Sequence, residues 1–249
     1  TGTNGQSLSE GIIVDCSRHM NQILELNLDE AWVRIQPGVV LDQLNDYLKP
    51  HGVFFAPNVS PSSRATLGGM INTDACGKGS RVYGRTSNHI LELNCVLSNG
   101  ETLQSFPIKN ESLEEHKQSQ GIQGEIFRTV DEVVRSKKEL IRETFPRLSR
   151  FMTGYNLAGV QDENDSIFNL NPLLSGSEGT LAFVSEARLK LTPIPKARLL
   201  LVVHYGSFKD ALRDASRLVG SNPTAIETLD EKILTLAKTD EIYPRVKKW

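Results

Sequence analysis

The chain has 249 residues, of which 39% are hydrophobic and 23% charged, and its formal net charge is -2 at pH 7. This composition predicts a folded protein with a sizeable core and excludes a globally disordered chain. The near-neutral balance argues against a general nucleic-acid binder. No apolar run approaches the ~18 residues of a membrane-spanning helix, so no integral membrane span is expected.

The three cysteines, Cys16, Cys76 and Cys95, are far apart in the sequence. They fit neither a disulfide framework nor a Cys-x-x-Cys metal site, so a reducing compartment is expected. The five histidines share no ligand spacing, and no metal site is predicted. Because the sequence starts at Thr1 without Met, we expect it to begin inside a longer gene product.

Apolar periodicity and turn residues predict most elements of the first part of the chain. In chain order we expect a buried strand at 11–15, a strand at 31–36, a helix at 40–49, a short helix at 66–75, a loop at 77–84, a strand at 90–97, a turn at 98–100, a strand at 101–103, a charge-rich helical excursion at 109–150 and a strand at 183–191. The turn contains Asn99-Gly100, which is a strong hairpin signal.

The pattern changes after Pro193 and Pro195. The last part of the chain predicts a strand at 199–205, a helix at 207–219 opened by Ser207, a strand at 225–229 and a helix at 228–237. This β-α-β pattern is typical of the start of a second domain. We therefore expect one domain over 1–195 and a second over 196–249.

Three segments rich in glycine and hydroxyl residues, 1–7, 66–84 and 176–180, are the notable chemical feature. Ser177 does not lie in a Gly-x-Ser-x-Gly nucleophile elbow, because position 175 is Ser, and no Walker P-loop occurs. Glycine lets backbone N–H groups approach a ligand, and successive N–H groups form anion-binding nests. Each segment alone also fits a tight turn; together they suit a diphosphate.

The same segments carry a family resemblance. Thr1-Gly2-Thr3-Asn4-Gly5-Gln6-Ser7-Leu8 followed by Gly11-Ile12-Ile13-Val14-Asp15 resembles the FAD-binding loop and next strand of the vanillyl-alcohol-oxidase (PCMH-type) flavoproteins. Ala65-Thr66-Leu67-Gly68-Gly69 is similar to their second flavin loop. Gly154-Tyr155-Asn156-Leu157 and Gly176-Ser177-Glu178-Gly179-Thr180 resemble the D-lactate, glycolate and D-2-hydroxyglutarate dehydrogenase subgroup. The match covers residues 1 to about 195.

The resemblance implies an α+β fold: a PCMH-type FAD-binding domain of two α/β subdomains, its N-terminal part missing, followed by the start of an α+β substrate (cap) domain. It implies non-covalent FAD, because no His occurs in the first loop. The implied cofactor-binding residues are Gly2, Asn4, Gly5, Ser7, Thr66, Leu67, Gly68, Gly69, Gly77, Tyr83, Gly84, Ile90, Glu178, Gly179 and Val184. Ile90 and Val184 fit strand core equally well, and Tyr83 fits loop packing.

Several positions depart from the family pattern or leave their role open. Asp74 stands where the family commonly has Asn, and Ala182 replaces a common Gly. Arg64, Arg81 and Arg85 are candidates for stabilising an anionic reduced flavin, or for surface ion pairs.

The implied function is that of the FAD-binding fragment of a flavin-dependent D-2-hydroxy-acid dehydrogenase of the D-lactate or D-2-hydroxyglutarate type. It would oxidise the hydroxy acid by hydride transfer to flavin. The implied partners are a small 2-hydroxy acid and an electron acceptor, either a quinone or an electron-transfer protein, and the implied location is cytoplasmic or peripheral to the inner membrane. The catalytic residues, and an iron–sulfur cluster, would lie outside this chain, which alone would be inactive. The alternatives are a flavin-dependent alcohol or sugar oxidase of the same fold and a cofactor-free binding module.

Overall fold

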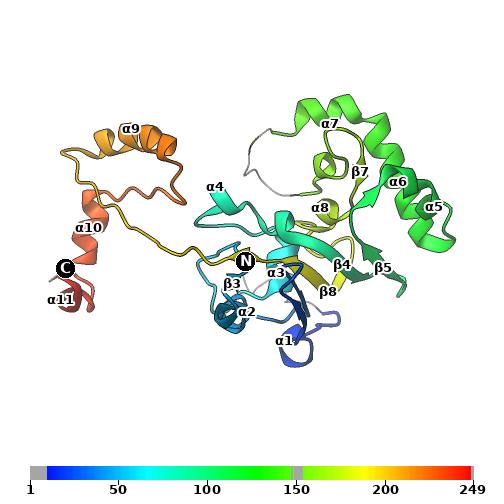
Figure 1. Cartoon of the computed structure of the whole chain (residues 1–249), viewed down its shortest axis with the longest axis horizontal. Coiled ribbons are helices and arrows are strands. Elements are labelled where there is room, and N and C mark those ends of the chain that lie inside the picture. Colours follow the sequence, from blue (N-terminus) through cyan, green and yellow to red (C-terminus); the bar gives the residue numbers. More distant parts are fainter. Residues whose placement is uncertain (1–9, 147, 149–153, 248–249) are drawn as a thin grey trace. The chain divides into compact units, whose positions relative to one another are not determined.

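The computed structural model describes residues 10–146, 148 and 154–247. The chain divides into two compact units, Thr1–Ile194 and Pro195–Trp249. The larger unit is built around a five-stranded antiparallel sheet (Figure 1). In spatial order its strands are β1 (Ile23–Asn27), β2 (Trp32–Ile35), β8 (Phe183–Lys190), β4 (Ile90–Val96) and β5 (Thr102–Ser105).

Helices and two small sheets complete the larger unit. Its helices are α1 (Cys16–His19), α2 (Leu41–Leu48), α3 (Leu67–Asn72), α4 (Ser80–Tyr83), α5 (Asn110–Lys117), α6 (Gly121–Ser136), α7 (Lys138–Thr144) and α8 (Asn171–Leu174), with 3-10 turns η2 (Lys49–His51), η3 (Thr86–His89) and η4 (Leu157–Gly159). The small sheets pair β3 (Val53–Phe54) with β9 (Thr192–Pro193), and β6 (Ile108–Lys109) with β7 (Ile167–Phe168).

Side-chain alternation gives the large sheet one apolar and one charged face. Val33 pairs with Leu189 and Leu93 with Ala187, and these four buried residues share a core with apolar residues of α2 and α3. Burying such a face is the main favourable contribution to folding.

The opposite face of the sheet holds the carboxylate of Glu92. Arg34 lies 3.2 Å from it and Gln104 donates to it at 2.9 Å, and Arg188 lies 3.5 Å away. Burial by itself would raise the pKa of Glu92, but the hydrogen bond from Gln104 and the guanidinium groups of Arg34 and Arg188 outweigh it, and the pKa is lowered. The buried charge is therefore compensated.

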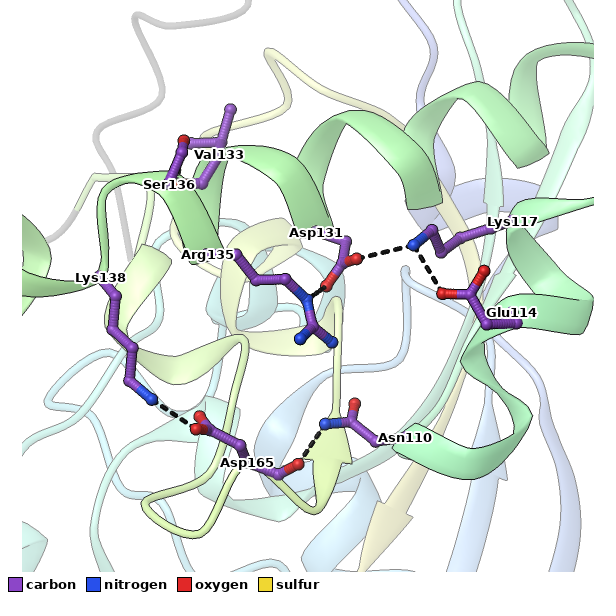
Figure 2. A network of polar contacts seen from close by, with 9 residues as sticks. All are labelled: Asn110, Glu114, Lys117, Asp131, Val133, Arg135, Ser136, Lys138 and Asp165. Carbon is purple, nitrogen blue, oxygen red and sulfur yellow. Dashed lines mark hydrogen bonds and ion pairs between the residues drawn. The ribbon is translucent and has the colours of Figure 1, made fainter.

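The charge-rich segment forms α5, α6 and α7 beside the β5 edge of the sheet (Figure 1). Asp131 on α6 is buried, and it binds Lys117 of α5 at 2.9 Å and Arg135 at 2.5 Å (Figure 2). Desolvation opposes ionisation of Asp131, yet these two cations keep its pKa below the ordinary value. Lys138 also pairs with Asp165 (Figure 2). The helices predicted for this segment are thus confirmed, and the ion pair between Lys117 and Asp131 joins α5 to α6.

The smaller unit contains α9 (Phe208–Leu218), η5 (Val219–Ser221), α10 (Glu231–Ala237) and α11 (Tyr243–Val246). Ser207 caps α9 by accepting from the Asp210 amide at 3.2 Å, as expected. Asp230 caps α10 in the same way at 2.8 Å.

Three strand predictions are wrong. Residues 11–15, 199–205 and 225–229 form no strand in the part of the chain that the structure describes. Ile12 is 95% exposed and Leu199 is 99% exposed. A strand is stable only when its backbone groups pair with a neighbouring strand, and apolar composition does not supply that neighbour. Conversely, β1 was not predicted, and residues 80–83 of the predicted loop form α4.

Among the described residues, no helix is both long and apolar enough to cross a bilayer.

Candidate functional site

Helix α3 carries the second glycine-rich segment. Thr66 caps it by accepting from the Gly69 amide at 3.3 Å. The amides of Leu67 and Gly68 donate to the carbonyls of Val39 and Pro37, both at 2.8 Å. A Cβ at Gly68 would lie 2.6 Å from the Pro37 Cβ, which explains a glycine there by packing within the chain. The Leu67 and Gly68 amides are therefore already hydrogen-bonded within the chain. Gly69 is less crowded than Gly68, because a Cβ there would meet only the Thr66 hydroxyl oxygen, at 3.2 Å.

The third glycine-rich segment lies against the end of α3. The Gly176 amide donates to the carbonyl of Ile71 at 3.0 Å, and the Glu178 amide donates to that of Asn72 at 2.9 Å. These two bonds bring together segments that are far apart in the sequence. The second and third glycine-rich segments, residues 66–73 and 176–180, are therefore in direct contact.

The turn at 176–180 needs unusual backbone angles. Gly176 and Gly179 have φ of 77°, and Glu178 has φ of 52° between them. Glycine adopts this left-handed region without a steric penalty. A Cβ at Gly179 would meet nothing within 4 Å, and both Glu178 and Gly179 are exposed. The outer side of this turn is open to a ligand.

Hydroxyl groups fix the same turn. The Thr180 hydroxyl donates to the Ser177 carbonyl at 2.6 Å, and the Tyr155 hydroxyl lies 2.8 Å from the Thr180 oxygen. Because the Thr180 proton is directed to Ser177, Tyr155 is the donor in the second bond. Ser177 is buried in the turn, which is consistent with a turn residue rather than a nucleophile.

Gly77, Tyr83 and Gly84 lie between α3 and β4, where Tyr83 is the last residue of α4. A Cβ at Gly77 would lie 2.5 Å from the Asn58 carbonyl oxygen, and Gly84 has φ of 74°. The Tyr83 ring packs edge-on against Phe54 with centroids 5.6 Å apart. The local backbone geometry therefore explains why positions 77 and 84 are glycine. Tyr83 packs against a neighbouring side chain, which was the alternative to a flavin contact.

Ile90 and Val184 are buried members of β4 and β8 and belong to the hydrophobic core. Gly2, Asn4, Gly5 and Ser7 lie outside the described residues.

Two polar side chains near the site were not predicted. The Asn72 amide oxygen and the Ser175 hydroxyl oxygen are buried and have no hydrogen-bond partner among the described residues. Asn72 donates through its amide nitrogen to the Gly68 carbonyl at 2.9 Å. A buried acceptor without a donor is costly, and here it stands beside two glycine-rich segments. Neutral hydroxyl and amide groups next to an open backbone turn fit a cofactor with hydroxyl and imide donors and a diphosphate, such as FAD.

The chain is similar to known FAD-binding proteins. Residues 1–105 match the family described as FAD binding domain. The chain is 54% identical to a D-2-hydroxyglutarate dehydrogenase of Pseudomonas putida, over 100% of this chain and 25% of the relative. It is 51% identical to the Escherichia coli protein of the same name, over 99% of this chain and 24% of the relative. A cytochrome-type D-lactate dehydrogenase of Saccharomyces cerevisiae is 29% identical, over 96% of this chain and 32% of its own length.

The fold is also found among solved structures. An alkyldihydroxyacetonephosphate synthase superimposes with a TM-score of 0.59 at 20% identity, over 93% of this chain and 33% of its own. The chain spans about a quarter of the length of the D-2-hydroxyglutarate dehydrogenases it matches. The predicted α+β fold class and FAD as cofactor are confirmed. These matches support the predicted resemblance to the FAD-binding flavoproteins of the vanillyl-alcohol-oxidase (PCMH) type.

Proposed function

We propose that this chain is the FAD-binding portion of a flavin-dependent D-2-hydroxy-acid dehydrogenase whose substrate is D-2-hydroxyglutarate. The observation that carries the proposal is identity of 54% and 51%, over essentially the whole chain, to relatives named for that activity. The D-lactate dehydrogenases of Saccharomyces cerevisiae and Kluyveromyces lactis are far less similar, at 29% and 25% identity. Similarity at this level favours a shared substrate.

The chain's own residues would bind and orient the cofactor. FAD, when bound, supplies the two-electron redox chemistry. Thr66, Asn72 and Thr180 offer neutral hydroxyl and amide groups near α3, and the turn at Glu178 and Gly179 presents open backbone. Gly2, Asn4, Gly5 and Ser7 are proposed to wrap the diphosphate through backbone and hydroxyl donors. No side chain of this chain is assigned a catalytic role.

The domain assignment, the acceptor and the compartment are also proposals. Residues 1–195 would form the FAD-binding domain, and residues 196–249 the start of the substrate domain. A quinone or an electron-transfer protein would reoxidise the flavin, and an iron–sulfur cluster would lie outside these residues. We also propose a cytoplasmic location, free or at the inner membrane surface; the three free cysteines Cys16, Cys76 and Cys95 fit a reducing compartment.

The test is substrate profiling of the full-length protein with a dye as electron acceptor. We expect a flavin absorption spectrum that is released on denaturation, and the highest kcat/KM with D-2-hydroxyglutarate. D-lactate and glycolate test the neighbouring activities, and L-2-hydroxyglutarate is the stereochemical control. Absence of flavin after reconstitution with FAD, or a preference for D-lactate, glycolate or a simple alcohol, would overturn the proposal.

A further inference from the structure

A buried ion pair connects the two ends of the loop that carries Gly77 and Gly84. The Arg85 guanidinium lies 3.0 Å from the Asp74 carboxylate, and only 8% and 4% of these side chains are exposed. Asp74 closely follows α3, and Arg85 directly precedes η3 and β4. The sequence left Arg85 open as a flavin contact or a surface ion pair; the structure shows that its pair with Asp74 is buried.

Further hydrogen bonds join the two segments at the ends of this loop. The second oxygen of Asp74 accepts from the Ser87 amide at 2.8 Å. The Ala75 carbonyl accepts from both the amide and the hydroxyl of Thr86, at 3.1 and 2.6 Å. Residues 74–75 and 85–87 are therefore clasped by one ion pair and three hydrogen bonds.

The backbone of Asp74 is bent to make this clasp. Its φ is 45°, in the left-handed region that Asp and Asn tolerate better than other residues with a side chain. The bend follows α3 and turns the carboxylate toward Arg85 and the Ser87 amide. A larger or branched residue would satisfy neither the angle nor the two contacts.

We propose that Asp74 and Arg85 are positioning residues for FAD, which hold the α3 segment and the Gly84 segment in register before the cofactor binds. This inference rests on the proposed FAD binding. Arg85 also neutralises the buried Asp74 carboxylate beside α3, so the pair adds no net charge next to the candidate site. Removing either partner breaks the ion pair that joins the two segments.

The experiment measures the FAD dissociation constant of the full-length apoprotein by flavin fluorescence, together with the visible circular dichroism of bound flavin. The variants are Asp74→Asn, Arg85→Gln and the double variant. Asp165→Asn is a matched control, because Asp165 also has a positive φ, 54°, and pairs with Lys138, but at an exposed site. We expect each single variant to weaken FAD binding by about tenfold or more and to change the flavin dichroism. The double variant, which also lacks the ion pair, should weaken FAD binding to a similar extent, and Asp165→Asn should match the parent.

The outcomes separate this inference from the proposed function. If the parent binds no FAD, both fail. If the parent binds FAD and Asp74→Asn binds it equally well with the same dichroism, only the positioning role fails, even if the thermal midpoint of the apoprotein falls. If the single variants do not fold, the double variant decides: loss of FAD from a folded double variant supports the role, and parental affinity and dichroism overturn it.

Discussion

The Glu178 amide donates to the Asn72 carbonyl oxygen at 2.9 Å, and this bond seats the turn at 176–180 on the end of α3. Neither residue belongs to a strand, so no sheet register supports the contact. The turn therefore depends on its own backbone angles, above all those of Gly176 and Gly179.

Replacing Gly179 by Ala should affect FAD binding more than stability. The φ of 77° at Gly179 carries a cost of about 1 kcal/mol for any residue with a Cβ. Gly100 in the hairpin turn is a matched control, with φ of 86° and, like Gly179, nothing within 4 Å of an added Cβ. We expect Gly179→Ala and Gly100→Ala to lose similar unfolding free energy in urea. Only Gly179→Ala should raise the FAD dissociation constant, by about tenfold; equal constants in the two variants would contradict this.

Gly68→Ala should destabilise the larger unit whether or not FAD is present. The new Cβ would lie 2.6 Å from the Pro37 Cβ and 3.0 Å from its carbonyl oxygen. Relieving such an overlap costs about 1–3 kcal/mol, measured by urea denaturation of the apoprotein. Gly206→Ala, where nothing lies within 4 Å and no positive φ occurs, is the control and should stay within about 0.5 kcal/mol of the parent. A parental midpoint for Gly68→Ala would show that α3 can move away from Pro37.

Glu92 should make the protein sensitive to acid. Burial opposes its charge, but Gln104, Arg34 and Arg188 together lower its pKa in the folded state. A lowered folded pKa contributes stability above the unfolded pKa of about 4.3 that is lost as the pH falls through the folded value. Glu92→Gln should therefore lose about 1–2 kcal/mol at pH 7 and show a shallower decline of stability below about pH 4.3.

The control for Glu92 is Glu186→Gln. Glu186 lies 3.6 Å from Arg34 on the same face, but a third of its side chain is exposed. Glu186→Gln should therefore lower the free energy of unfolding at pH 7 by only about 0.5 kcal/mol or less. Parallel pH curves for the parent and Glu92→Gln would rule out the assigned role of Glu92.

Asp131→Asn should loosen the helices α5 and α6. The variant removes the carboxylate that Lys117 and Arg135 share, and the Asp131 side chain is only 4% exposed. Both cations reach water, so the loss is expected at about 2–3 kcal/mol, the lower end for a broken buried pair. Glu114→Gln removes a 66% exposed partner of the same lysine and should change stability by less than about 0.5 kcal/mol. Hydrogen exchange of α5 amides gives a second readout.

Cys95 should resist alkylation in the native protein. Burial raises the pKa of its thiol to about 12, and the thiolate is the reactive form. Iodoacetamide at pH 8 is expected to modify Cys95 only after urea unfolding, as followed by peptide mass spectrometry. Native labelling of Cys95 at the rate seen in urea would mean that β4 opens readily.

The sequence predicted elements whose signals are local. Asn99-Gly100 identified the β4–β5 hairpin, and the apolar spacing of residues 40–49 identified α2. Residues 199–205 were predicted as a strand from composition, but composition does not specify a pairing partner. β1 was missed because its inward and outward residues do not alternate cleanly.

The candidate site was only partly predictable for the same reason. Glycine-rich segments are visible in the sequence, and their roles follow from the family resemblance. The bonds from Glu178 to Asn72 and from Arg85 to Asp74 join loop residues without periodic patterns. Such contacts depend on tertiary geometry, so only the coordinates could reveal them.

The segment Leu199–Val203 has a consequence for how this chain behaves in concentrated solution. Its five consecutive aliphatic side chains are between 44% and 99% exposed. An extended, uncharged, water-facing stretch of this kind readily captures another chain through backbone pairing. A charged substitution such as Leu200→Lys should therefore reduce aggregation of this chain, as followed by light scattering.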